Sequence, residues 1–148
     1  MIESEAFEDC INLEKVTIPS SITEIKYRTF SYCESLIEVI IPSSITKIGN
    51  ESFYGCRKLE SIIIPSSVTS IGKEAFKECS SLKIIQINSL ISIIEDETFM
   101  NCSSLKQISI PYSVEKIGDG AFNECSSLEK ISFEKNEDKT VHSRLNII

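Results

Sequence analysis

Six cysteines and one histidine are the residues of this chain whose types suit nucleophilic, redox or metal chemistry. Zinc sites gather their ligands at short spacings, and the sequence contains no C-x-x-C pair. His142 stands apart from the cysteines, which leaves a Cys-His or Ser-His pair without a base. We therefore predict no catalytic residue, no metal site, no cofactor and no enzymatic activity. The cysteines instead recur every 23 residues, at Cys10, Cys33, Cys56, Cys79, Cys102 and Cys125.

The apolar residues follow the same interval, without insertion or deletion. Phenylalanine and leucine each form a series, and four series of mainly isoleucine and valine accompany them, so that seven columns align in all. Such self-similarity marks each interval as one structural unit of a repeat protein. The two clearest series are Phe7, Phe30, Phe53, Phe76, Phe99, Phe122 and Leu13, Leu36, Leu59, Leu82, Leu105, Leu128.

One unit, starting at Leu59, shows what each interval is expected to form. Ile62 and Ile64 alternate with exposed positions, which predicts a short strand that Pro65 ends. Residues 68–71 predict a second extended piece, and residues 73–79 contain good helix formers, which predicts one or two helical turns. Because a unit of this size cannot bury its apolar side alone, the units are expected to stack around one core.

The stacking bears on the chemistry of the cysteines. Equivalent positions in stacked units form a column of parallel side chains about 4.8 Å apart. A disulfide prefers Cβ atoms about 3.8 Å apart whose side chains converge. We therefore predict buried, free thiols at the six cysteine positions.

This pattern, L-x-x-I-x-I-P-x-S-V-x-x-I-G-x-x-A-F-x-x-C, resembles the leucine-rich repeat family in its BspA-like subtype. The likeness extends from about Ile2 to Phe133. It implies an α/β-type repeat solenoid: a right-handed coil with a parallel β-sheet on the concave face, short second strands, and short helical or 3-10 turns on the other sides. In one unit the matching residues are Leu59, Ile62, Ile64, Pro65, Ser67, Val68, Ile71, Gly72, Ala75, Phe76 and Cys79.

One unit departs from the pattern, since Asn88, Leu90 and Glu95 stand where proline, serine and glycine are expected. This unit is expected to carry a local bend while remaining a full coil. Lys26 and Glu3 also occupy the glycine position, so the position does not strictly require a positive φ.

We expect one solenoid domain over residues 1–133, with about six coils of which the first is truncated. Its start lacks a cap, which fits a fragment or an end covered by another subunit. Residues 134–148 leave the pattern. Their charged start fits a disordered linker, whereas their apolar residues fit a cap over the last coil, and both interpretations stay open. The apolar residues are Val141, Leu145, Ile147 and Ile148.

The net charge of −7 and the pI near 4.8 argue against binding to nucleic acids and anionic membranes. No apolar stretch reaches the roughly 20 residues of a membrane helix, so we expect no membrane insertion. The first ten residues show no signal peptide, which predicts a cytoplasmic protein. The family resemblance implies the cell surface instead, and the localisation is left open.

Outward-pointing positions of the predicted first strands are free to serve a partner. An exposed patch of isoleucines with a polar rim is more often a binding interface than a surface without a binding role. The alternative is that isoleucine is there for its β-propensity. The patch has no aromatic or arginine anchor, which argues against high affinity. The predicted partner-binding residues are Ile37, Glu38, Ile40, Ser61, Ile63, Ile84 and Gln86.

The sequence thus predicts a protein-binding module that presents its strand surface to a partner. The resemblance implies a surface adhesin whose partner is a host matrix or surface protein. One alternative is a self-assembling piece of a larger array, a homo-oligomer joined through exposed solenoid ends. Another is an intracellular scaffold or regulatory subunit, which free thiols favour.

Overall fold

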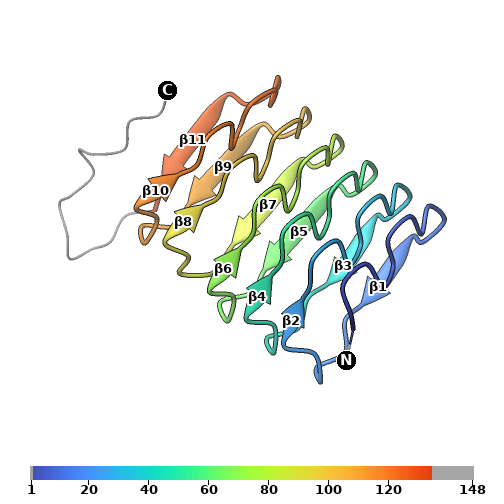
Figure 1. The fold of residues 1–148 in the computed structure, drawn as a ribbon. Helices are drawn as coiled ribbons and strands as arrows, with labels where there is room; N and C mark the ends of the chain where they lie inside the picture. Colours follow the sequence, from blue (N-terminus) through green and yellow to red (C-terminus); the bar gives the residue numbers. More distant parts are fainter. Residues whose placement is uncertain (1, 135–148) are drawn as a thin grey trace.

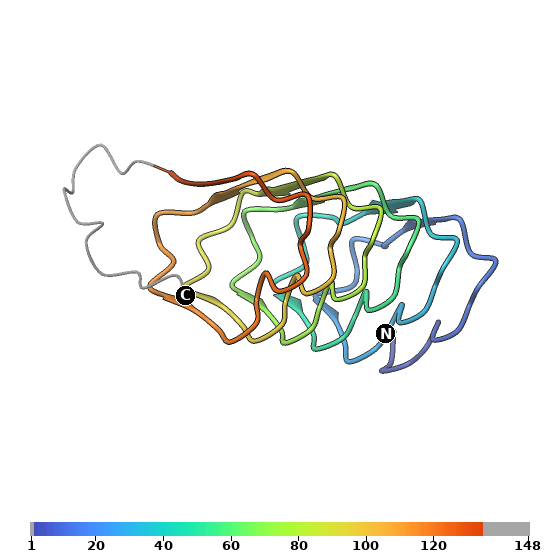
Figure 2. The same ribbon diagram turned by 90° about the horizontal axis from the view of Figure 1, so that it is seen from above.

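A computed structural model describes residues 2–134 as a β-solenoid of about five turns (Figure 1). The coils follow one another in chain order along one axis, as Figure 2 shows from above. Residues 135–148, on which most of the predicted cap or linker falls, lie outside the described residues. Within residues 2–134, no helix is long and apolar enough to cross a membrane.

Each coil contributes one strand to a first row, as the period-two pattern predicted. In these strands exposed and buried residues alternate, which is the pattern of a strand with one face on the core. Neighbours that pair do so in parallel and with a register of one repeat, for example Ile62 with Ile85. The first-row strands are β1 (Lys15–Thr17), β3 (Glu38–Ile40), β5 (Ser61–Ile64), β7 (Ile84–Ile87), β9 (Gln107–Ile110) and β11 (Lys130–Phe133).

A second row of two-residue strands follows the turn after each first strand. Three of them form one parallel sheet, β2-β4-β6, and β8 pairs with β10. The predicted second strands are therefore confirmed. They are β2 (Glu24–Ile25), β4 (Lys47–Ile48), β6 (Ser70–Ile71), β8 (Ile93–Ile94) and β10 (Lys116–Ile117).

The core is made of the predicted columns. The phenylalanine rings stack with centroid distances of 5.4 to 5.7 Å from Phe7 to Phe122. The cysteines are free thiols, as predicted, and those from Cys33 to Cys125 are buried. Each buried thiol donates to a phenylalanine carbonyl of the preceding coil, for example Cys56 to Phe30 at 3.2 Å. The column is therefore a set of satisfied core side chains.

The prediction of helical turns on the remaining side is wrong. Within residues 2–134 this side contains only turns, and we call its seven-residue pieces the turn segments. Each segment has a positive φ at its third and seventh residues, such as Glu74 (56°) and Glu78 (59°). A left-handed residue ends a helix, so the helix formers there cannot propagate one. The turn segments are residues 3–9, 26–32, 49–55, 72–78, 95–101 and 118–124.

Hydrogen bonds between coils explain why these segments form turns and not helices. The N–H groups of Glu74, Phe76 and Glu78 donate to carbonyls of the next coil at 2.9 to 3.1 Å. In a helix the same groups would bond within their own segment. Stacking therefore gives the backbone N–H groups as many hydrogen-bond acceptors as a helix would. The geometry of the solenoid thus overrides the local helix propensity.

Candidate partner-binding face

The outward side chains of the first-row strands form one surface, which we call the β-face. Four isoleucines stand out on it: Ile37, Ile40, Ile63 and Ile84 are 41%, 51%, 58% and 64% exposed. All four were singled out from the sequence, and the structure places them on or beside the consecutive strands β3, β5 and β7. An exposed cluster of large apolar side chains is unusual on the surface of a monomeric protein and is typical of a protein–protein interface.

The polar residues of the predicted set surround these isoleucines. Ser61 is in register with Ile84, and Ile63 with Gln86, so a polar and an apolar side chain lie side by side at each step. Glu38 is in register with Lys15 and forms an ion pair with it at 3.0 Å. All seven predicted residues are therefore brought together on one face, with the polar side chains interleaved among the isoleucines.

A groove on this face was not visible in the sequence. The first row is hydrogen-bonded as three separate pairs, β1-β3, β5-β7 and β9-β11, so the ladder is interrupted between β3 and β5. A groove of about 350 Å³ lies at that interruption. Its lining combines the predicted Ile37, Glu38, Ile40, Ser61 and Ile63 with Val39, Ile41, Ile62 and Pro65.

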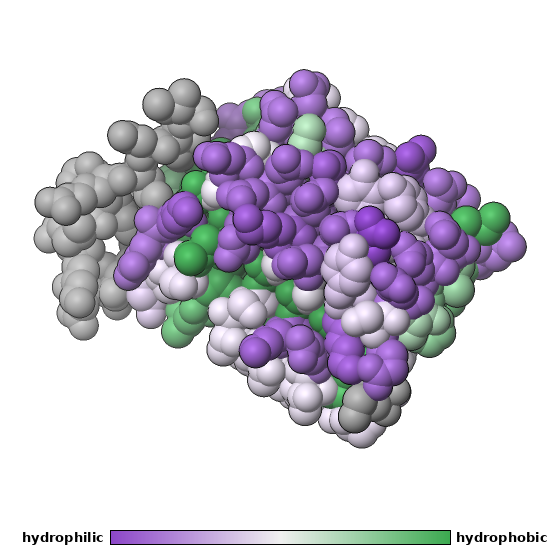
Figure 3. Space-filling view, in the orientation of Figure 1, coloured by the Kyte–Doolittle hydropathy of each residue, from purple (hydrophilic) through white to green (hydrophobic). Residues whose placement is uncertain are grey.

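The turn segments have the opposite character, being strongly charged. Figure 3 shows the molecule from their side, and hydrophilic residues cover most of it. Acidic residues there outnumber basic ones by twelve to four, which accounts for the acidity of the chain. The basic ones are Lys26, Arg28, Lys73 and Lys77, and the acidic ones are Glu3, Glu5, Glu8, Asp9, Glu51, Glu74, Glu78, Glu95, Asp96, Glu97, Asp119 and Glu124.

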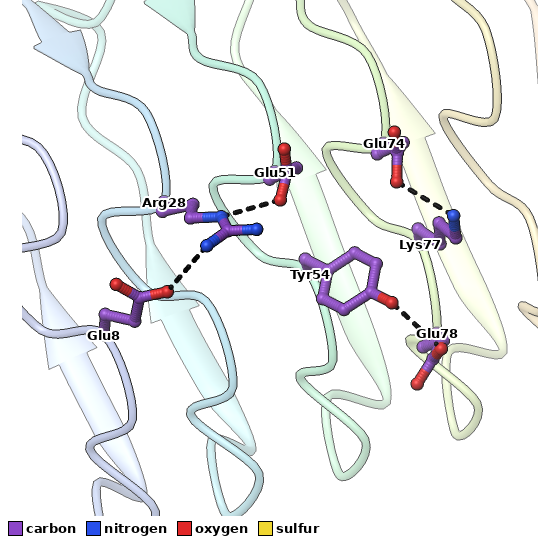
Figure 4. Close-up of polar contacts among 7 residues, drawn as sticks. All are labelled: Glu8, Arg28, Glu51, Tyr54, Glu74, Lys77 and Glu78. Atoms are coloured by element: carbon purple, nitrogen blue, oxygen red, sulfur yellow. Dashed lines mark hydrogen bonds and ion pairs between the residues drawn. The ribbon is translucent and has the colours of Figure 1, made fainter.

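The cations of the turn segments are engaged by carboxylates of neighbouring coils (Figure 4). Arg28 contacts Glu51 at 2.7 Å and Glu8 at 3.3 Å, and its hydrogen bond to Glu51 raises its pKa. Lys77 bonds Glu74 of its own segment at 2.9 Å, as Figure 4 shows. It also bonds Glu97 of the next coil at 2.6 Å, and the two contacts raise its pKa. Arg28, of a residue type that often anchors interfaces, therefore connects neighbouring coils and is not free for a partner.

A second exposed apolar cluster also escaped the sequence reasoning. Leu90, Ile93 and Tyr112 are exposed on two adjacent coils, away from the β-face. Leu90 replaces a serine whose hydroxyl, in Ser44, Ser67 and Ser113, donates to the preceding coil. The departure of Leu90 from the serine column is the sequence signal by which its exposure could have been found.

The described residues offer little for catalysis. No group of three or more His, Cys, Asp or Glu in residues 2–134 is placed to hold a metal ion. Burial raises the pKa of the Cys33 thiol to about 12 and that of Cys125 to about 11. Thiols with a raised pKa are poor nucleophiles at neutral pH, because the thiolate is the reactive form.

Comparison with known proteins agrees with the repeat pattern. The profile of the BspA type leucine-rich repeat region matches residues 1–129 in six copies. A leucine-rich repeat protein from Bacteroides ovatus is 38% identical, with a TM-score of 0.84 over 88% of this chain and 34% of its own. No curated protein matches the chain.

Two further solved structures are similar. The pneumococcal vaccine antigen PcpA is 28% identical, with a TM-score of 0.79 over 90% of this chain and 36% of its own. A leucine-rich repeat protein from Eubacterium ventriosum is 27% identical, with a TM-score of 0.74 over 82% of this chain and 33% of its own. The chain thus spans about a third of the length of these relatives.

Proposed function

The chain belongs to the BspA-type leucine-rich repeat family, and from this we propose that it is a protein-binding module whose β-face receives the partner. Repeats of this family are generally non-enzymatic binding modules, and we infer no catalytic role. The observation that carries the proposal is the gathering of Ile37, Ile40, Ile63 and Ile84, all exposed, on one face.

The distribution of charge supports the choice of face. On the turn segments, a docking protein would displace ion pairs such as Arg28 with Glu51, at the cost of desolvating both groups. On the β-face, it would cover isoleucine side chains, whose burial is favourable at about 25 cal/mol per Å². Binding through the β-face is therefore expected to give a more favourable free energy of association than binding through the turn segments.

We propose further that the protein acts as a surface adhesin, with a host matrix or surface protein as its partner. PcpA is described as a vaccine antigen, and by analogy this chain would be displayed where other proteins can reach it. An intracellular scaffold remains the rival proposal. Localising the full-length protein by immunostaining of intact and permeabilised cells separates the two, because only a surface protein stains on intact cells.

Self-assembly is a second candidate, which one observation favours. Phe7 is exposed, whereas its column partners Phe30, Phe53, Phe76 and Phe99 are fully buried. A further coil, from another copy or another segment, would cover this ring. Light scattering over a range of concentrations tests the idea, since an average mass that stays constant contradicts assembly through this end.

A matched pair of variants tests the binding proposal. Replacing Ile40, Ile63 and Ile84 with lysine should abolish partner capture, because charge would enter the apolar centre of the interface. The control replaces Ser43, Ser66 and Ser70, which are exposed and away from the β-face, with lysine as well. A partner protein retained by the wild type and the control but lost by the isoleucine variant supports the proposal. Equal retention by all three contradicts it.

A further inference from the structure

The groove between β3 and β5 differs from the rest of the β-face because it opens toward the core. Ile41 lines it and is only half-buried, although its column partners Ile18, Ile64, Ile87 and Ile110 are buried. β3 and β5 are also not held together by backbone hydrogen bonds at this point. An apolar core residue is therefore accessible from the partner's side.

The charged groups near the groove are neutralised by neighbours on the same face. Glu38 lines the groove, and its carboxylate is held by Lys15 at 3.0 Å. Glu60, which precedes β5, is held by Lys83 at 3.0 Å. The remaining lining is isoleucine, valine, proline and one serine. An occupant matched to this site is uncharged and apolar.

The size of the groove sets a limit on the occupant. Its volume of about 350 Å³ lies at the lower end of the roughly 300–1,000 Å³ of small-molecule sites. That is room for one large side chain and not for a folded element. Large aromatic side chains are the residues that most often anchor interfaces by filling such pockets.

The β-face itself supplies no such anchor. Its outward positions on β3, β5 and β7 are Glu38, Ile40, Ser61, Ile63, Ile84 and Gln86, none of them aromatic. Hot-spot side chains of one partner typically meet a pocket of the other. The pocket is on this chain, and so the aromatic side chain has to come from the partner.

We propose that the groove between β3 and β5 is the anchor site of the β-face and receives one aromatic side chain of the partner protein. This rests on the proposed function and adds the chemistry of the contact. Ile40 and Ile63 flank the ring, and Ile41 and Ile62 lie beneath it. Ile84, which does not line the groove, contributes to the surrounding apolar rim only.

The test uses the full chain and two small probes, N-acetyltryptophanamide and N-acetyllysinamide, followed through the isoleucine methyl signals in NMR spectra. The aromatic probe should shift the signals of Ile40, Ile41 and Ile63 in a saturable manner, and the lysine probe should not. Ile63→Ser should weaken binding of the aromatic probe about tenfold, because one flank of the ring is lost. Leu90→Ser, at an exposed leucine away from the β-face, is the matched control and should leave it unchanged.

A groove-filling variant guards against an unfolded Ile63→Ser protein. In Ser61→Phe the new ring occupies the groove, so the spectrum stays that of a folded chain and the probe no longer binds. Absence of probe binding to the wild type, equal shifts from both probes, or equal losses in Ile63→Ser and Leu90→Ser overturn the anchor site. Partner capture by the β-face can survive each of these results, which separates the anchor proposal from the proposed function.

Discussion

Two stretches of the solenoid carry the same repeat and pair their second strands differently. In the glycine region, residues 24–72, the second row is continuous, β2-β4-β6. In the variant unit, residues 88–95, β8 is not paired with β6, although it pairs with β10 on its other side. Of the three departures in this unit, the one at the second strand is in the glycine column, where Gly49 and Gly72 give way to Glu95.

Close approach of the backbones explains this difference. A Cβ atom on Gly72 would lie 2.5 Å from the backbone nitrogen of Asn50, which is too close for two non-bonded atoms. Without it, the Gly72 N–H reaches the carbonyl of Ile48 at 2.9 Å. Gly118 does the same toward Ile94, at 2.7 Å, and there β10 is paired. Glycine is thus needed for contact with the preceding coil, and its φ is not positive.

The interruptions are distributed so that no junction between coils loses both rows. Where β6 and β8 are unpaired, β5 and β7 are paired. Where β3 and β5 are unpaired, β4 and β6 are paired, and where β7 and β9 are unpaired, β8 and β10 are paired. Turn-segment bonds cross these junctions as well, for example from Glu74 to Asp96 at 3.1 Å. The core columns are continuous throughout. The comparison therefore indicates that packing of the core columns holds the coils together, and that the strand pairing of either row can be missing at a given junction.

The largest expected effect tests whether the core is indeed common to both regions. Phe53→Ala and Phe99→Ala should each lower the free energy of unfolding by about 3–5 kcal/mol, because both rings are fully buried in one stack. Phe53 represents the glycine region, and Phe99 follows the variant unit. Urea unfolding measures both. A loss at Phe99 of less than half that at Phe53 would mean that the missing ladder weakens the core as well.

Much of this fold follows from the sequence, for a definite reason. Side-chain columns with one period fix which residues face the core, and they correctly predicted both strand rows, the phenylalanine stack and the free thiols. The exposure of Ile40, Ile63 and Ile84 followed from the same alternation. Whether these residues bind a partner stays a prediction, because the alternation of buried and exposed positions determines which side chains are exposed and not what they bind.

Two features were beyond the sequence because they depend on contacts between backbones. The helix formers near Glu74 and Glu78 favoured a helix, but the left-handed φ at both residues comes from bonding to the next coil. The groove between β3 and β5 lies where the first-row ladder is interrupted, but Ile87 stays buried at the similar interruption between β7 and β9. No residue substitution in the repeat marks the position of the groove. Local propensity and side-chain pattern report neither kind of contact.

The second prediction sharpens the role of the glycine column. Gly72→Ala should cost about 1–3 kcal/mol of unfolding free energy, because its methyl group forces the coil away from Asn50. Glu95→Ala is the control at the equivalent position, where a Cβ is already accommodated, and should change stability by less than about 0.5 kcal/mol. Amide hydrogen exchange should show lost protection at position 72 in the first variant only. Equal effects of the two substitutions would refute the close-approach argument.

The smallest expected effect concerns an ion pair that crosses the junction lacking the second-row ladder. Lys73 bonds the carboxylate of Asp96 at 2.6 Å, and this lowers the pKa of Asp96 and raises that of Lys73. Asp96 also accepts the N–H of Asp119 at 3.1 Å, as Asn50 accepts that of Lys73 at 3.0 Å. Asp96→Asn therefore installs the residue of the glycine region, keeps the backbone bond and removes only the charge.

The wild type should be slightly more stable than Asp96→Asn at neutral pH. A lowered carboxyl pKa contributes stability above the ordinary value of about 3.9, and this contribution is lost as the pH falls through the folded-state pKa. The raised pKa of Lys73 has the opposite sign, so its contribution is present at neutral pH and disappears above about 10.4. Urea midpoints at acidic, neutral and alkaline pH measure the difference, which molar salt should also shrink because the pair is exposed. A difference that persists in acid would show that the geometry of the carboxylate, and not its charge, joins the two coils.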